Sequence, residues 1–330
     1  MQAQTGTLLA GFSRRAVLGT ALAFGLAIAP AAQAQIKGLE IIAPANPGGG
    51  WDQTARAMQA ALQEAGLASG AQVQNIAGAG GTIGLAQFVT SKKRDGHALL
   101  VGGLVMLGAI VTNKSPVSME DVTPLARLTG EYELVVVSVD SPIRTMADLV
   151  TKLKADPGSV SWGGGSAGGT DHILAGLIAK AAGADLTKLN YIAHSGGGEA
   201  LASILGGHVT AGVSGYEEFA PQIIAGKLRG IGISSDQRLP GIDVPTLKEQ
   251  GIDVSLVNWR GVMAGSQIRE ADRKALTAAI EGMVKSQNWQ ETLKKRGWLD
   301  MYQPADEFAA FLKQDRAKIE TTLKDVGLVK

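Results

Sequence analysis

Four glycine-rich turns contain the residues of this sequence that are best suited to binding chemistry. They cover residues 46–52 (Asn-Pro-Gly-Gly-Gly-Trp-Asp), 78–84 (Gly-Ala-Gly-Gly-Thr-Ile-Gly), 163–171 (Gly-Gly-Gly-Ser-Ala-Gly-Gly-Thr-Asp) and 194–199 (His-Ser-Gly-Gly-Gly-Glu). Glycine lets the backbone approach a ligand closely, and a helix that begins at such a turn presents unpaired N–H groups and the positive end of its dipole. Hydroxyl groups accompany the turns at Thr82, Ser166, Thr170 and Ser195. The sequence therefore predicts a site for a carboxylate or a phosphate.

Two enzyme patterns overlap the third turn. Residues 164–168 fit G-x-S-x-G, in which Ser166 would be the nucleophile of an exported α/β hydrolase. A triad would then need an acid and a histidine downstream, and the last histidine, His208, lies only 42 residues beyond Ser166, which is cramped for that fold. Residues 163–168 also fit the dinucleotide pattern G-x-G-x-x-G, but Asp185 precedes the next expected strand instead of ending it. The hydrolase remains the alternative to a binding protein, and a cofactor-dependent oxidoreductase is a more remote one.

The composition excludes several other classes of protein. The formal charge is +1, from 31 Lys and Arg against 30 Asp and Glu, whereas sequence-independent nucleic-acid binders carry a basic excess. There is no cysteine, and the four histidines lack the spacing of helix-borne metal ligands, so we expect neither a metal nor another cofactor. Glycine is unusually frequent, at 44 of 330 residues, and the excess falls in the turns described above.

The N-terminus has the pattern of an export signal. Arg14 and Arg15 precede an uncharged apolar run over residues 16–29, which is too short to span a bilayer. The small residues Ala32 and Ala34 predict a signal peptide over residues 1–34 that is cleaved after Ala34. The paired arginines resemble a twin-arginine signal, and an ordinary Sec signal remains open. Cleavage would leave 29 basic against 30 acidic residues in the exported chain, so its net charge offers no strong steering field.

The elements that must position the turns follow an alternating order of strand and helix, which indicates an α/β fold. Strands are expected at 39–43, 73–76, 98–102, 160–162 and 189–192, and helices at 52–62, 83–89, 146–154, 172–182 and 199–205. Asp52 is expected to cap the first helix, and Thr145 with Asp148 predicts a capping box. The tail changes character, with helices expected at 269–286, 288–296 and 305–326 and little strand signal.

Two extended stretches, 133–139 and 254–262, flank the middle of the chain without turn signals. If the chain crosses between two lobes there, residues 36–134 and 259–330 form lobe 1 and residues 135–258 form lobe 2. The ligand would then bind in the cleft between the lobes.

Other side chains near the turns complete the predicted site. Arg260 is the nearest cation, Trp51 is expected to form a wall, and Tyr191 and Tyr216 could close lobe 2 over the ligand. Asp171, like Asp52, is expected mainly to fix its own loop. The full set of predicted ligand-binding residues is Asn46, Gly48, Gly49, Gly50, Trp51, Gly80, Gly81, Thr82, Ser166, Ala167, Thr170, Asp171, Tyr191, Ser195, Gly196, Tyr216 and Arg260.

The same residues resemble the signature of a known family. Residues 44–52 with Arg56, then 78–81 with Gly84, and further matches through Trp259 resemble the substrate-binding proteins of tripartite tricarboxylate transporters, also called TctC or Bug receptors. The resemblance covers essentially all of the chain after the signal. It implies a two-lobed periplasmic binding protein of type II-like fold, each lobe a mostly parallel sheet flanked by helices, with a helical C-terminal tail.

The resemblance also implies a function. It predicts a monomeric receptor without catalytic activity that delivers a small carboxylate to a permease with large and small membrane subunits. The Gly-Gly-Gly-Trp-Asp sequence at residues 48–52 looks like the tricarboxylate branch, which favours citrate or a related tricarboxylate. Many relatives have Ser-Thr-Asp there, so dicarboxylates and aromatic acids stay open as ligands.

Overall fold

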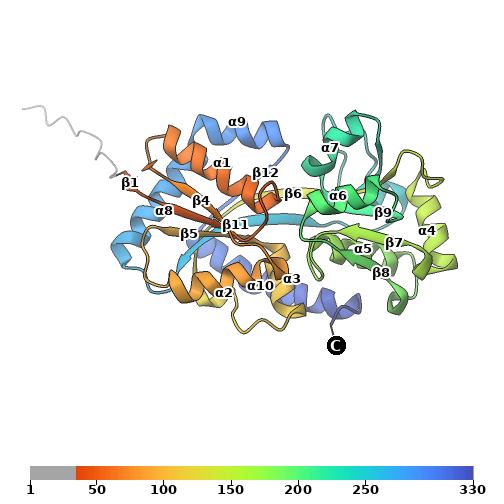
Figure 1. Cartoon of the computed structure of the whole chain (residues 1–330), viewed down its shortest axis with the longest axis horizontal. Helices are drawn as coiled ribbons and strands as arrows, with labels where there is room; N and C mark the ends of the chain where they lie inside the picture. Colours follow the sequence, from red (N-terminus) through yellow and green to blue (C-terminus); the bar gives the residue numbers. More distant parts are fainter. Residues whose placement is uncertain (1–34, 330) are drawn as a thin grey trace, which may run out of the picture. The chain divides into compact units, whose positions relative to one another are not determined.

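A mixed sheet of ten strands organises the chain in the computed structural model, which describes residues 35–329 (Figure 1). The strands follow the order β4 (Gln72–Asn75), β2 (Glu40–Ala43), β5 (Ala98–Gly103), β11 (Val257–Gly265), β6 (Val122–Ser138), β9 (Ala211–Gly215), β7 (Ser161–Gly164) and β8 (Asn190–Ala193). In addition, β10 (Leu228–Ile233) and β12 (Leu299–Pro304) pair with β6, and β1 (Ile36–Lys37) pairs with β3 (Ala68–Ser69). The predicted α/β class is confirmed.

Strand direction changes across this sheet. The pairs β2–β4, β2–β5, β7–β8 and β7–β9 are parallel. All strands that pair with β6 are antiparallel to it. The predicted parallel βα units therefore lie toward the two ends of the sheet, and antiparallel strands join them in the middle. The glycine turns follow the carboxyl ends of strands in both parallel sets, which is where ligands bind in such folds.

Most helices of the described chain match the sequence prediction, but those at Leu104–Thr112 and Tyr216–Ile224 were not predicted. The first half of the chain contributes α1 (Gly50–Glu64), α2 (Thr82–Ser91), α3 (Leu104–Thr112) and α4 (Met146–Ala155). The second half contributes α5 (Thr170–Ala181), α6 (Gly197–Leu205), α7 (Tyr216–Ile224), α8 (Glu270–Lys285), α9 (Gln287–Arg296) and α10 (Ala305–Asp325). The capping box of Thr145 and Asp148 is present at α4. The expectation of little strand in the tail was wrong, because Leu299–Pro304 forms β12 on β6.

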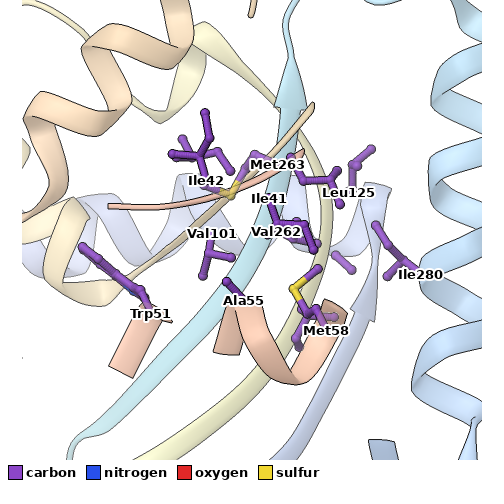
Figure 2. Close-up of a cluster of buried hydrophobic side chains, with 14 of the residues drawn as sticks. Ile41, Ile42, Trp51, Ala55, Met58, Val101, Leu125, Val262, Met263 and Ile280 are labelled. Atoms are coloured by element: carbon purple, nitrogen blue, oxygen red, sulfur yellow. The ribbon is translucent and has the colours of Figure 1, made fainter. Parts of the chain in front are cut away.

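The largest hydrophobic core includes the residues that pack α1 against the sheet (Figure 2). Ala55 and Met58, on the apolar face predicted for α1, are fully buried beside Ile41 of β2 and Val262 of β11. Burying side chains of this size contributes roughly 1.5–3 kcal/mol each. This packing fixes the start of α1 relative to β11, and both elements supply residues to the site.

The strand β6 links two separate groups of core residues. The largest cluster comes from residues 36–128 and 259–323, with Ile173 from α5, and two further clusters come from residues 134–254. Within β6, the part up to Tyr132 pairs with β11 and the part from Glu133 onward pairs with β9. Figure 1 shows β6 and β11 running from one group of elements toward the other.

Three further findings concern the described residues. None of their helices is long and apolar enough to cross a membrane. Their His, Asp and Glu side chains form no group suited to holding a metal ion. The signal peptide predicted for residues 1–34 lies outside the part of the chain that the structure describes.

Candidate functional site

A pocket of about 700 Å³ brings the four glycine turns together. We call the loops β2–α1 and β4–α2 the first wall, and the loops β7–α5, β8–α6 and the junction β9–α7 the second wall. Most predicted site residues line this pocket: Asn46, Gly48, Gly49, Gly50, Trp51, Gly80, Gly81, Ser166, Ala167, Thr170, Asp171, Ser195, Gly196 and Arg260. Turns more than 140 residues apart in the sequence thus share one cavity.

The first wall offers backbone donors at the N-terminus of α1. The N–H of Gly48 donates to Asp52 over 2.8 Å and that of Gly49 donates to the Asn46 carbonyl over 3.1 Å, so both are used inside the loop. The N–H groups of Gly50 and Trp51 donate to no acceptor among the described residues. The free donors of this loop therefore lie at the third glycine and the residue after it, at the positive end of a 15-residue helix, which is an arrangement suited to an anion.

Arg260 adds the pocket's one cationic side chain next to these donors. Its guanidinium group lies against Gly50, where any Cβ would overlap it. Arg260 also forms an ion pair with Glu131 of β6, and both side chains are almost fully buried. The absence of a side chain at Gly50 therefore lets a paired arginine reach the start of α1.

Asp52 holds the first wall in place from behind. It is buried, outside the pocket lining, and accepts hydrogen bonds from Arg56 and Asn75 as well as from Gly48. Burial raises its pKa, but these hydrogen bonds outweigh burial and keep the pKa below its usual value. The prediction that Asp52 caps the helix was wrong in position, because Gly49 occupies the N-cap and α1 already begins at Gly50.

The second wall is acidic. Asp171, Glu199 and Glu218 line the pocket in the first turns of α5, α6 and α7. Asp171 accepts a 2.6 Å hydrogen bond from the Gly165 N–H, and Glu199 accepts one of 3.1 Å from the Ser195 N–H. Each acid thus fixes its own turn. Glu218 accepts instead from the Ser214 hydroxyl.

Two more carboxyl groups lie behind this wall on β6. Glu133 is fully buried, and neither of its carboxyl oxygens has a hydrogen-bond partner among the described residues. Burial, with the neighbouring carboxylates, raises its pKa well above the usual range. Burial also raises the pKa of Asp171 to about 7 and that of Glu131 to about 7, although Arg260 lowers the latter. Burial without a hydrogen-bond partner therefore strongly disfavours the charged form of Glu133.

Three predicted residues are placed outside the pocket lining. Thr82 is buried and donates its hydroxyl hydrogen to the Ala79 carbonyl. Tyr191 donates to the Gly165 carbonyl over 2.9 Å and stacks on His172, so its ring supports the loop from beneath. Tyr216 packs against a core cluster instead of the pocket. These residues lie in or near the glycine turns in the sequence, but in the fold their side chains contact the protein's own backbone and core instead of the pocket.

Several lining residues carry no signal that sequence reasoning could use. Val105 lies in α3, an apolar segment without helical periodicity, Asn113 is its C-cap, and Asn258 precedes Arg260 by two positions on β11. Ser214 lies in β9 and Glu218 in α7, and no glycine-rich turn of the kind that marked the other loops joins these two elements. The strand pairing of β6 with β9 and β11 brings Ser214 and Asn258 to the pocket.

The fold and site together define a class of protein. A mixed α/β sheet with a pocket of helix N-termini between two sets of loops is the architecture of a periplasmic solute-binding protein. The chain belongs to the tripartite tricarboxylate transporter receptor family, whose model matches residues 54–328. Members of this family are receptors for solutes and not enzymes, so the hydrolase and oxidoreductase alternatives are set aside.

Comparison with individual proteins agrees with this assignment. Protein BugT of Bordetella pertussis is 27% identical over 88% of this chain and 89% of its own length. A TctC solute-binding protein from Polaromonas is 28% identical, with a TM-score of 0.64 over 88% of this chain and 98% of that one. MatC from Rhodopseudomonas palustris, solved with bound malate, has the same fold, with a TM-score of 0.76 at 23% identity over 88% of this chain and 99% of that one.

Proposed function

We propose that this protein is an exported receptor that binds a small carboxylate in the pocket and delivers it to the permease of a tripartite tricarboxylate transporter. The observation that carries the proposal is the pair of free N–H groups at Gly50 and Trp51 beside the Arg260 guanidinium. Charge-assisted hydrogen bonds of this kind contribute roughly 1.5–3 kcal/mol each. Three of them, at the upper end of this range, reach the ~8 kcal/mol of micromolar binding, before ordering costs. Malate in MatC supports the ligand class.

The proposal includes the division of the chain. Residues 36–134 with 259–330 form lobe 1 and carry the first wall, and residues 135–258 form lobe 2 and carry the second wall. The separate core clusters on either side of residues 128–134 support this division. A ligand that touches both walls would favour a closed arrangement of the lobes. We further propose a signal peptide cleaved after Ala34, a monomeric receptor, and a permease of large and small membrane subunits.

The experiment is a thermal-shift and calorimetric panel of carboxylates on the exported protein. A ligand present at 100 times its dissociation constant should raise stability by about 2.7 kcal/mol. Gly49→Val should abolish this shift. Gly49 has an ordinary negative φ, but an added Cβ would lie 3.2 Å from the Asn46 carbonyl, so the loop must shift and displace the free N–H groups that follow. Gly158→Val, at an exposed glycine outside the pocket, is the matched control. Wild-type affinity in a folded Gly49→Val protein would overturn the proposed site.

Gly81→Val is unsuitable for the same test. Gly81 has φ +87°, and an added Cβ would lie 2.6 Å from the Trp51 ring. That substitution would strain the loop and disturb the core, so a loss of binding would report on folding.

A further inference from the structure

The second wall of the pocket has more hydrogen-bond acceptors and negative charge than a plain carboxylate ligand can use. Asp171, Glu199 and Glu218 line the pocket, and Arg260 is the one cationic side chain among the lining residues. The charge of Arg260 is already balanced by its buried partner Glu131. A tricarboxylate would therefore place a second and third negative charge against acids that no free cation offsets.

An unpaired hydroxyl lies in the same wall. Thr170 Oγ1 is fully buried and has no hydrogen-bond partner among the described residues, although Thr170 lines the pocket. A buried polar group without a partner is unfavourable, so a ligand group that donates to it would add affinity. Thr170 is the first residue of α5 and directly precedes Asp171.

The carboxylate of Glu218 lies against Gly197, as the Arg260 guanidinium group lies against Gly50. The carboxylate lies so close to Gly197 that any Cβ there would overlap it. The Ser214 hydroxyl donates to Glu218 Oε2, which leaves Oε1 without a hydrogen bond from the described residues. Asp171 and Glu218 interact electrostatically across the same wall.

We propose that Thr170, Asp171 and Glu218 form a subsite for an ammonium group, so that the ligand is an amino-substituted carboxylate and not a tricarboxylate. Its carboxylate binds at Gly50, Trp51 and Arg260, and its ammonium group donates three hydrogen bonds to the acidic wall. This inference rests on the proposed function, because it assigns the second half of the same ligand.

Matched ligand pairs test the subsite. Calorimetry on the exported protein at pH 8 and constant ionic strength compares aspartate with succinate, glutamate with glutarate, and 4-aminobutyrate with butyrate, with malate and citrate added. In at least one pair we expect the amino member to bind at least tenfold more tightly. Malate separates a hydroxyl donor from an ammonium donor, and tighter binding of malate than of aspartate and glutamate would contradict the proposal.

Two variants test whether Glu218 is responsible for the preference for an amino ligand. Glu218→Gln should reduce the preference for the amino ligand at least tenfold while the affinity for its unsubstituted partner stays equal or rises. Glu217→Gln is the matched control, because Glu217 is the neighbouring residue on α7, lies outside the pocket lining and pairs with Arg296. It should leave the ratio of the two affinities unchanged.

The possible outcomes separate the two proposals. If unsubstituted carboxylates or citrate bind at least as tightly as every amino ligand, the ammonium subsite is wrong while the carboxylate receptor stands. The same follows if Glu218→Gln leaves the preference intact. If no carboxylate of either kind binds, both the subsite and the proposed function are overturned.

Discussion

The two walls of the pocket are built on one plan but differ in charge. Asp52 and Asp171 each lie in the first turn of a helix that begins at a glycine-rich turn between a parallel strand and the helix, and each accepts a hydrogen bond from a glycine N–H of its own loop. Asp52 faces Arg56 and Asn75, outside the pocket lining. Asp171 faces the pocket with Glu133 and Glu218 near it.

This difference shows that a loop motif fixes backbone geometry but not electrostatics. The pKa of Asp52 is lowered because its hydrogen-bond donors outweigh the effect of burial, whereas burial dominates at Asp171 and raises its pKa to about 7. The same turn therefore produces a neutralised, donor-rich wall in one place and an acidic, acceptor-rich wall in the other. The partners that other strands and helices supply decide which wall results.

The largest expected effect comes from removing the cation that the walls share. Arg260→Leu leaves Glu131 buried without its partner, which should lower the free energy of unfolding by about 3–5 kcal/mol in urea titrations. Replacing both residues, as Arg260→Leu with Glu131→Leu, should recover most of that loss. Equal destabilisation in the single and double variants would show that the pair does not act as a unit.

The second largest effect is the pH dependence of the free energy of unfolding, which should differ in sign between the two walls. Glu131, Glu133 and Asp171 have raised pKa values, with Glu218 and Arg260 facing them. The folded state therefore holds more protons than the unfolded state between about pH 4 and pH 7, and stability should fall as pH rises through that range. We expect a loss on the order of 2–3 kcal/mol in ligand-free protein, measured by urea unfolding at each pH. Stability that rises over this range would contradict the acidic second wall.

The first wall should respond with the opposite sign. The lowered pKa of Asp52 contributes stability that is present above its usual value of 3.8 and is lost as pH falls below it. Other carboxyl groups with a lowered pKa, such as Asp95 and Asp272, lose stability in the same range. The part of the fall below pH 4 that disappears in Asp52→Asn, measured by urea unfolding, is therefore the share of the first wall.

The smallest effect comes from a matched pair of substitutions. At pH 7, Asp52→Asn should cost about 1–3 kcal/mol, because it removes a charge that Arg56 and two other donors depend on. Asp171→Asn should cost less, since that carboxyl is partly protonated at this pH, and should flatten the pH profile described above. Chemical unfolding of both variants at pH 5 and pH 7 measures the contrast. Equal costs at pH 7 would mean that the two turns are electrostatically alike.

Much of the fold could be predicted from local pattern. The capping box at Thr145, the buried face of α1 and the glycine turns between strand and helix all depend on residues close in sequence. The glycine turns also contain thirteen of the fourteen predicted site residues that line the pocket, and the other one, Arg260, lies on β11. Segments without periodicity were missed, including α3, whose residues are almost uniformly apolar.

The acidic character of the site could not be predicted in the same way. Glu131 and Glu133 lie in an extended segment, and the register between β6 and its neighbours determines that they are buried beneath the pocket. Arg260 was expected near the site, but its pairing with Glu131 joins residues that are 129 positions apart. Such contacts depend on strand pairing, which short-range spacing does not encode.

The long strand β6 also has a consequence for the order in which the molecule is built. Its first part must wait for β11, and the 129-residue separation of Glu131 and Arg260 implies a loop-closure cost of about 4 kcal/mol. By contrast, residues 134–254 contain two core clusters within one continuous stretch. We therefore expect the acidic wall to fold while the chain end is still free, and the donor wall to gain Arg260 only when the chain returns. The folding molecule would thus pass through a stage with acceptors in place but no cation to hold a carboxylate.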